Sequence, residues 1–305
     1  MKIFLLKLLI FVLIITSLIA GVVMLSDSMI KDREGSLLPL SREVCYVFAG
    51  NSTIECAVDD SRIKHSVNIA QAGEAYMYTY VKLKALLSEN EQVKTVFLSF
   101  SFADIMMEKE ESWLFGNYFI IEKVQYYNHL LGKPEKVLLL HKNPLAYLKG
   151  VIKSVVKSAE SVIMSYRRDP NSESIPNFGG YKHLIRDRLD ADPGLEMNQT
   201  QVADQSQYQI KYLRLISELC HEKSVDLILL NPPKYRSYNE NVNREIKGNW
   251  MKVRQSLSAD SLLDLSAFPL PDSCYADLSH LNYRGARVFS DHLNILLNPD
   301  SLLAK

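Results

Sequence analysis

The chain has 305 residues, of which 47% are hydrophobic and 23% charged, values typical of a globular protein with a sizeable core. Its 35 basic and 35 acidic side chains balance, which argues against a nucleic-acid-binding surface or a polybasic membrane patch. The length beyond the N-terminal segment is enough for one large domain or two small ones.

An uncharged apolar segment opens the chain. It runs from Leu8 to Leu25, and its roughly 18 residues approach the length of a bilayer-spanning helix. Lys2 and Lys7 precede it, so the positive-inside rule places the N-terminus in the cytoplasm and the remainder outside. A cleaved signal peptide is the alternative. We therefore predict a single-pass signal anchor in the cell membrane over residues 1–25, followed by a polar stalk over 26–43.

Strands alternate with helices after the stalk. Apolar runs bounded by turn residues predict five strands, at 44–49, 66–70, 93–100, 225–230 and 262–265. Helices are predicted from Ser52 onward, over 74–87, over 208–222 and over 283–297. This alternation predicts a three-layer α/β domain over 44–305, with a five-stranded parallel sheet between helices.

The stretch from about 104 to 203 interrupts this alternation. One helical face is traced within it by Ile152, Val155, Ala159 and Val162. Because a structureless loop of this length is uncommon in a compact domain, we predict a mostly helical insertion between the third and fourth strands. It either shapes an acceptor-binding surface or packs as a cap.

Four cysteines are spread along the chain, at Cys45, Cys56, Cys220 and Cys274. An extracytoplasmic location permits disulfides, and the sequence does not choose among the three possible pairings. Four partly buried thiols are the alternative. No cysteine or histidine spacing is typical of a zinc site.

Two short motifs near opposite ends of the predicted domain contain reactive residue types. Gly50-Asn51-Ser52 follows the first strand, where the carboxyl edge of a parallel sheet meets a helix N-terminus. Asp277-Leu278-Ser279-His280 lies in the loop before the last helix. A nucleophilic serine needs a base and a group that orients the base. We therefore predict a triad in which Ser52 attacks, His280 carries the proton and Asp277 holds the imidazole.

Each of these residues also has an ordinary structural interpretation. Ser52 alone would commonly be a helix N-cap, Asp277 a turn residue and His280 a loop histidine. The combination of a serine after the first strand with Asp-x-x-His before the last helix favours the catalytic interpretation.

With these motifs the chain resembles the SGNH (GDSL-like) hydrolase superfamily. Gly50-Asn51-Ser52 is similar to its first block, with Asn in place of the usual Asp, and Gly73 matches the second block. The run from Asp277 to Gly285 resembles the last block. Its continuation through Ala286 is especially similar to the membrane-anchored branch that includes alginate O-acetylation and D-alanyl transfer proteins. The resemblance leaves the insertion uncovered.

The resemblance implies a flavodoxin-like SGNH fold and an oxyanion hole made by the amides of Ser52 and Gly73. The third block of the family normally adds an Asn donor. This chain has Ser101-Phe102-Ala103-Asp104 there, so Ser101 is the candidate substitute. The mechanism needs no metal and no cofactor.

We therefore expect transfer of an acyl group, with acetyl favoured, to an extracytoplasmic cell-envelope polysaccharide at the periplasmic or outer face. A carbohydrate esterase with the same triad is one alternative. A non-catalytic glycan-binding or assembly protein is another, motivated by the missing Asn of the third block. The expected partners are a polysaccharide or ester substrate, the membrane through the N-terminal helix, and a membrane protein that supplies the acyl donor; no nucleic acid is expected.

Overall fold

The structure is a computed structural model of the chain. It describes residues 2–11, 13–14, 17, 21, 39–165, 178–186, 189, 204–240, 242 and 244–299. The chain divides into two compact units, Met1–Leu37 with Ile120–Pro176 and Leu38–Phe119 with Asn177–Lys305. The second unit contains the sheet and all of the predicted site residues.

A five-stranded sheet forms the centre of the second unit. Its strands are β1 (Tyr46–Ala49), β2 (Ser66–Asn68), β3 (Thr95–Ser99), β4 (Asp226–Asn231) and β5 (Ser261–Asp264). Their order is β2-β1-β3-β4-β5, and every neighbouring pair is parallel. This confirms the predicted α/β class and the five-stranded parallel sheet, with strand ends within two residues of those predicted.

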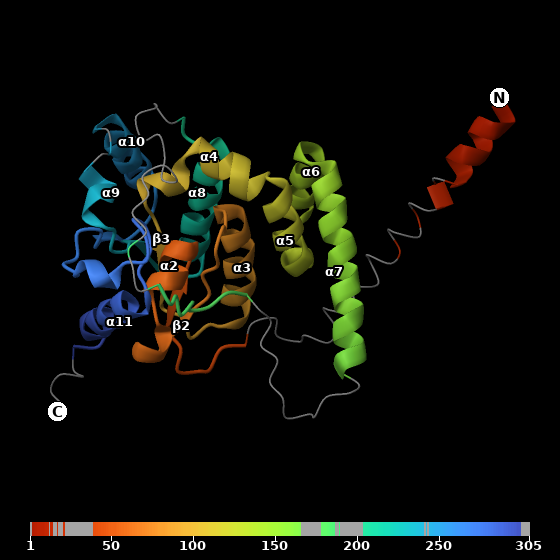
Figure 1. Cartoon of the computed structure of the whole chain (residues 1–305). Helices are drawn as coiled ribbons and strands as arrows, with labels where there is room; N and C mark the ends of the chain where they lie inside the picture. Colours follow the sequence, from red (N-terminus) through yellow and green to blue (C-terminus); the bar gives the residue numbers. More distant parts are fainter. Residues whose placement is uncertain are drawn as a thin grey trace. The chain divides into compact units, whose positions relative to one another are not determined.

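Helices of this unit lie on both sides of the strands (Figure 1). The longer ones are α2 (Ser52–Ala57), α3 (Tyr76–Glu89), α8 (Gln207–Glu222), α9 (Arg236–Glu240), α10 (Arg244–Gln255) and α11 (Tyr283–Leu297). The connection from β1 to β2 leads towards one edge of the sheet, whereas the connections from β2 to β3, β3 to β4 and β4 to β5 lead towards the other. Right-handed crossovers therefore place α2 on one face and α3 and α8 on the other. Accordingly, α2 packs against α11, and α3 packs against α8.

Short helical turns complete the second unit. They are η1 (Asp60–Arg62), η2 (Phe102–Ile105), α4 (Met107–Lys109), the π-helical turn η3 (Glu110–Leu114) and η4 (Asp272–Cys274). The turn η2 directly follows β3, at the edge of the sheet where Ser52 lies.

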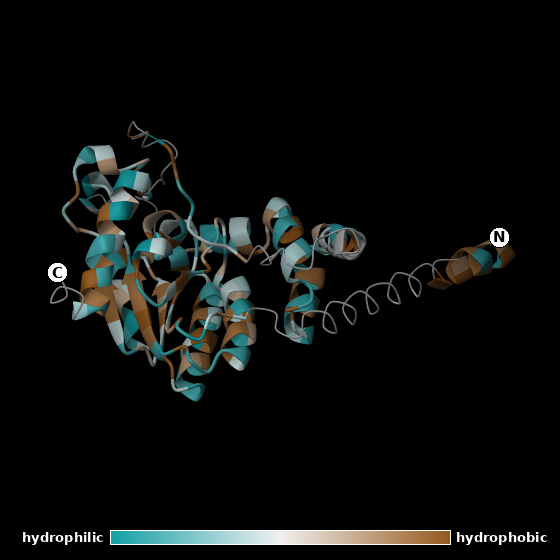
Figure 2. Ribbon diagram, turned by 90° about the horizontal axis from the view of Figure 1, so that it is seen from below, coloured by the Kyte–Doolittle hydropathy of each residue, from teal (hydrophilic) through white to brown (hydrophobic). Residues whose placement is uncertain are grey.

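The sheet supplies much of the core. All five residues of β3 are buried, as expected for a parallel strand covered on both faces. Phe48 of β1 stacks on Phe97 of β3 with ring centroids 4.7 Å apart. Figure 2 shows hydrophobic, brown strands at the centre of this unit. This rigid core fixes the strand ends from which the candidate site is built.

The residues that the structure describes from the end of β3 to Ser165 are mostly helical. Beyond the turns of the second unit these are α5 (Asn117–Tyr127), α6 (Lys133–Lys142) and α7 (Pro144–Ser165), and α6 packs against α7. Residues 178–186 follow as a segment without helix or strand. The rest of the predicted insertion over 104–203 lies mainly outside the described residues.

The predicted transmembrane segment is described only in part. Residues 2–11, 13–14, 17 and 21 are helical, and the stalk is described only from residue 39. Within the described residues, no helix combines the length and apolar character needed to cross a bilayer. The remainder of the predicted segment lies outside the described residues, and the anchor and the localisation stay predictions.

The cysteines are four free thiols. Cys56, Cys220 and Cys274 are buried, and burial raises the pKa of Cys56 and of Cys220 to about 12. The cysteines thus match the alternative of four thiols, and no disulfide contributes to the described part of the fold.

A buried ion pair fixes the loop that follows β2. Lys82 Nζ lies 2.8 Å from Glu74 Oε2, and both side chains are fully buried. The same ammonium donates hydrogen bonds to the carbonyl oxygens of Ile69 and Phe178. Burial lowers the pKa of Lys82, and the carboxylate of Glu74 opposes this shift. Because Ile69 and Glu74 bracket the loop, this pair clamps the segment that contains Gly73.

We predict that Lys82→Met lowers the free energy of unfolding by about 3–5 kcal/mol, because it leaves the buried Glu74 carboxylate without its cation. The double variant Lys82→Met/Glu74→Met should recover most of this loss. Urea unfolding of both variants checks the prediction, with Lys84→Met on the exposed side of the same helix as control. Equal losses in the single and double variants would contradict it.

Candidate active site

Ser52 is the first residue of α2, immediately beyond the carboxyl end of β1. The N-cap of this helix is Asn51, whose side-chain oxygen accepts a hydrogen bond of 2.9 Å from the amide of Thr53. The alternative interpretation of Ser52 as the helix cap is therefore wrong. Because Asn51 performs the capping, the Ser52 hydroxyl is available for another contact.

The fold brings Ser52, His280 and Asp277 together. Ser52 Oγ lies 2.8 Å from His280 Nε2, across a sequence separation of 228 residues. His280 Nδ1 lies 2.8 Å from Asp277 Oδ1. The serine comes from the β1–α2 turn and the other two come from the loop between β5 and α11. These distances are those of a hydrogen-bonded nucleophile, base and orienting group.

The loop that carries Asp277 and His280 is held by its own backbone. Asp277 Oδ1 accepts hydrogen bonds from the amides of Ser279 at 3.0 Å and His280 at 2.8 Å. Lys234, which is buried, donates from Nζ to the carbonyl oxygen of Ser279 at 3.0 Å. Asn282 then caps α11, because its side-chain oxygen accepts hydrogen bonds from the amides of Arg284 and Gly285. The imidazole is thus presented from a rigid turn.

The protonation of Asp277 determines the tautomer of His280. Burial raises the pKa of Asp277, but the hydrogen bond and charge of His280 and the two loop amides outweigh it and lower this pKa to about 2. An ionised carboxylate only accepts hydrogen bonds, so Nδ1 of His280 must donate to it. In the neutral ring Nε2 then carries the lone pair that faces Ser52.

The lowered pKa of Asp277 predicts a pH-dependent contribution to stability. The unfolded carboxyl titrates near its ordinary value of about 3.9, so between about pH 4 and pH 2 the unfolded state binds more protons. Asp277 should therefore contribute about 2 kcal/mol above pH 4 and lose this contribution on acidification towards pH 2. Urea unfolding at pH 5, 3 and 2 should show that the difference in unfolding free energy between wild type and Asp277→Asn becomes smaller as the pH falls. A difference independent of pH would contradict this.

The two backbone amides predicted to form the oxyanion hole have no acceptor among the described residues. They belong to Ser52, at the start of α2, and to Gly73, in the clamped loop. Gly73 has a positive φ of 60°, and a Cβ there would lie 1.9 Å from the ring of Phe119. An N–H group without an acceptor is the type of group that stabilises an oxyanion, and this role of Ser52 and Gly73 stays a prediction.

Ser101, the third predicted oxyanion donor, is occupied within the protein. Its hydroxyl donates to Asp104 Oδ2 at 2.9 Å, and its amide donates to the same oxygen at 2.7 Å. Donation from this hydroxyl to a substrate oxygen would require breaking the bond to Asp104. The role of Ser101 as an oxyanion donor thus stays a prediction. Its hydrogen bond to Asp104 would compete with donation to a substrate oxygen.

Asp104 is a residue that the sequence analysis did not single out. Its Oδ1 accepts a hydrogen bond of 2.6 Å from Asn51 Nδ2, and both side chains are buried. Its Oδ2 also receives the hydroxyl of Ser99 at 3.2 Å. Asp104 thereby joins the end of β3 to the residue that caps α2. The sequence did contain a signal for Asp104: it follows the third predicted strand, in the segment where the SGNH pattern normally has an Asn.

The contact between Asn51 and Asp104 favours an amide over a carboxylate at position 51. An aspartate there would place a second carboxylate where Asn51 Nδ2 now lies, 2.6 Å from Asp104 Oδ1. Two buried carboxylates at that distance cannot both be ionised without a large cost. Asn51 and Asp104 are therefore a matched pair.

We predict that Asn51→Asp destabilises the protein by about 1–3 kcal/mol and displaces Ser52, because it replaces a donor by a like charge. Asn51→Asp/Asp104→Asn exchanges the donor and acceptor and should restore most of the stability. Chemical unfolding of the two single variants and the double variant provides a complete cycle. Additive losses would show that the two side chains are not coupled.

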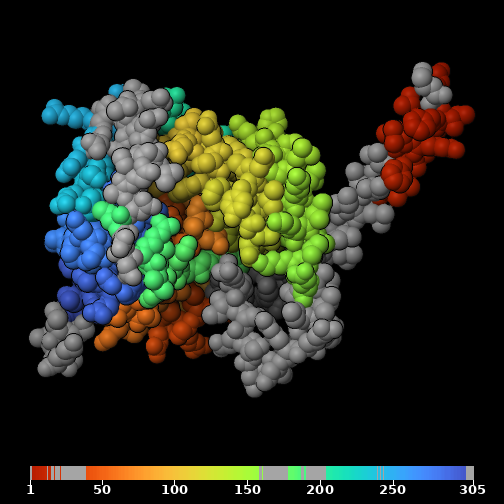
Figure 3. All heavy atoms as spheres, viewed as in Figure 1, coloured from red at the N-terminus to blue at the C-terminus, as the bar shows by residue number. Residues whose placement is uncertain are grey.

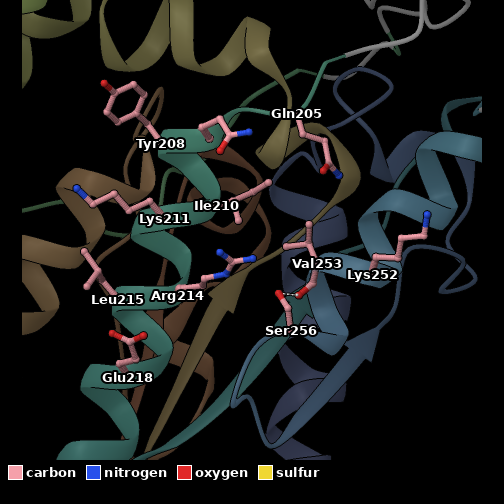
Figure 4. Close-up of a pocket in the computed structure, with 11 residues that line it drawn as sticks. Gln205, Tyr208, Ile210, Lys211, Arg214, Leu215, Glu218, Lys252, Val253 and Ser256 are labelled. Carbon is pink, nitrogen blue, oxygen red and sulfur yellow. Dashed lines mark hydrogen bonds between the residues drawn. The ribbon is translucent and has the colours of Figure 1, made fainter.

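Two cavities lie outside this constellation. The larger, of about 630 Å³, lies between α8 and α10 and has Lys211, Arg214 and Lys252 on its walls (Figure 4). The smaller, of about 320 Å³, is lined by residues of the loops after β4 and β5, including Tyr235 and Phe268. Neither Ser52 nor His280 lines either cavity.

Comparisons with known proteins leave the family open. A protein-family model that carries no functional description matches residues 194–301, which is less than half of the chain. No curated protein matches the chain. A solved structure from Streptococcus pneumonia, provisionally described as a platelet activating factor, is similar at 13% identity and a TM-score of 0.39, covering 93% of this chain and 98% of that one. This likeness is too weak to support an argument, so the SGNH resemblance remains a prediction.

Proposed function

We propose that the protein is a serine esterase or acyltransferase that works through an acyl-enzyme on Ser52. The observation that carries this proposal is the 2.8 Å contact between Ser52 Oγ and His280 Nε2, continued by the 2.8 Å contact from Nδ1 to Asp277. Serine at its own pKa is a weak nucleophile, and this contact is the one that activates it.

In the first half-reaction Ser52 Oγ attacks the carbonyl carbon of an ester and its proton passes to His280 Nε2. The amides of Ser52 and Gly73 receive the negative oxygen of the tetrahedral intermediate. His280 then returns the proton to the leaving alcohol as the carbon–oxygen bond of the ester breaks. The acyl group remains on Ser52, and Asp277 stays ionised beside the imidazolium.

The second half-reaction reverses these roles. The hydroxyl of an acceptor, either water or a sugar, gives its proton to His280 as its oxygen attacks the acyl carbon. The bond to Ser52 then breaks, and His280 returns the proton to Ser52 Oγ. Hydrolysis and transfer therefore use the same residues and differ only in the acceptor.

Within this class we propose acetyl transfer to a cell-envelope polysaccharide outside the cytoplasm. The support is the similarity of the run from Asp277 to Ala286 to the membrane-anchored transfer proteins, together with the uncharged apolar segment from Leu8 to Leu25. On this proposal a membrane protein supplies the acyl donor, and the apolar segment keeps the chain beside it.

A non-catalytic glycan-binding or assembly role is the second candidate. The observation in its favour is that the Ser101 hydroxyl already donates to Asp104, in a segment without the usual Asn. Loss of one oxyanion donor typically costs a factor of about 10² to 10³ in rate. A protein that has lost catalysis in this way would retain the fold and show no ester turnover.

We predict that Ser52→Ala reduces turnover of a small acetyl ester by at least about 10⁴-fold, because the nucleophile is removed. The assay is run with and without an oligosaccharide acceptor, and the products are identified by mass spectrometry. Acetylated sugar as product supports the transferase and free acetate supports the esterase.

Ser279→Ala is the matched control for this assay. It removes a hydroxyl that lies 3.2 Å from Asp277 Oδ1 and 3.0 Å from His280 Nδ1, while the backbone amides that hold the carboxylate and the contact from His280 Nδ1 to Asp277 Oδ1 remain. Its activity should fall by less than about tenfold. Wild-type rates in Ser52→Ala would contradict the proposed function, and absence of turnover in every protein would favour the binding role.

A further inference from the structure

The described end of the insertion passes directly beside the triad. We call residues 178–186 the strap; Figure 1 shows it crossing in front of α2 and β2, and Figure 3 shows its green atoms between orange and blue ones. Backbone hydrogen bonds join it to three segments of the site: Gly180 N to Ala70 O at 3.0 Å, Lys182 N to Glu55 O at 2.8 Å, and Tyr283 N to Leu184 O at 3.1 Å.

The beginning of the strap is packed against the loop that contains Gly73. Gly179 has a φ of 117°, and a Cβ there would lie 2.4 Å from the carbonyl oxygens of Ile69 and Ala70. The carbonyl of Phe178 accepts a hydrogen bond of 2.9 Å from Lys82, the cation that also clamps that loop. Only glycine permits this close approach of two backbones.

The end of the strap reaches Asp277. The carbonyl of Arg186 accepts a hydrogen bond of 2.9 Å from Asn282 Nδ2, which fixes the backbone beside the catalytic loop. Nη1 of Arg186 lies 3.6 Å from Asp277 Oδ2. The other oxygen of this carboxylate, Oδ1, is the one that faces His280 Nδ1.

We propose that Arg186 is a positioning residue of the active site, and that the insertion completes the triad by bringing this cation to Asp277. The carboxylate can rotate about its bond to Cβ, and the cation at Oδ2 opposes rotation that would turn Oδ1 away from His280. The inference rests on the proposed function, because it assigns Arg186 a role in that reaction.

A substrate-binding role for Arg186 predicts different kinetics. Arg186 is half exposed, with 52% of its side chain accessible, so a negatively charged substrate can also reach it from solvent. Its removal would then raise KM and leave the reactivity of Ser52 unchanged. Loss of positioning lowers kcat and slows every reaction of Ser52, even with a reagent that carries no charge.

The test compares Arg186→Gln and Arg186→Lys with wild type, on an uncharged acetyl ester and with a fluorophosphonate that labels reactive serines. For Arg186→Gln we expect kcat and the rate of Ser52 labelling to fall together by about tenfold, with KM unchanged. Arg186→Lys keeps the charge and should remain within about threefold of wild type. Both variants should unfold at the wild-type urea midpoint, since the side chain is half exposed.

Arg236→Gln is the matched control, because Arg236 also pairs with an aspartate, Asp272 at 3.4 Å, and its side chain is 70% exposed. It should behave as wild type. A wild-type kcat and labelling rate in Arg186→Gln would overturn the positioning role alone, as would a change confined to KM. A wild-type protein with neither turnover nor labelling would overturn the proposed function and this inference with it.

Discussion

The hydrogen bond from Asn51 to Asp104 is the contact on which the rest of the site depends. It is buried, it spans 2.6 Å, and it joins the end of β3 to the cap of α2. Because Asn51 caps the helix, Ser52 becomes the first helical residue, with its hydroxyl directed to His280 and its amide without an acceptor among the described residues. An apolar residue at position 51 or 104 would leave the other side chain buried without this hydrogen bond. It would also remove the contact that holds the residue before Ser52 in place.

The parallel sheet provides the second constraint, since it brings the carboxyl ends of β1, β3 and β5 to one edge. The loop after β5 carries an aspartate whose pKa is lowered to about 2 and a histidine held by the same carboxylate. The strap then links that loop to α2 and to the segment containing Gly73. The strap, which lies outside the resemblance to a known family, thereby contacts several parts of the candidate site.

The sequence predicts the sheet well because buried parallel strands are short apolar runs, and α11 was predicted with the bounds that it has, Tyr283–Leu297. Ser52 and His280 could be paired from the sequence because each lies in a short turn whose place follows from the neighbouring strand or helix, and the structure places Oγ and Nε2 2.8 Å apart. Asp104 and Arg186 were missed, since their contacts with Asn51 and Asp277 join side chains across 53 and 91 positions, which no local pattern encodes. The alternative that Ser52 caps the helix was wrong by one residue, because Asn and Ser are equally good caps and the sequence alone does not decide between them.

The central claim is that His280 activates Ser52 to form a covalent acyl-enzyme. It is tested most directly by quenching the protein with acid during turnover of an acetyl ester and mapping the added mass by peptide mass spectrometry. The account predicts one acetyl group on the peptide that contains Ser52 in the wild type, and none in His280→Ala. Turnover with no acetyl on Ser52, or equal acetylation of Ser52 without His280, would contradict it.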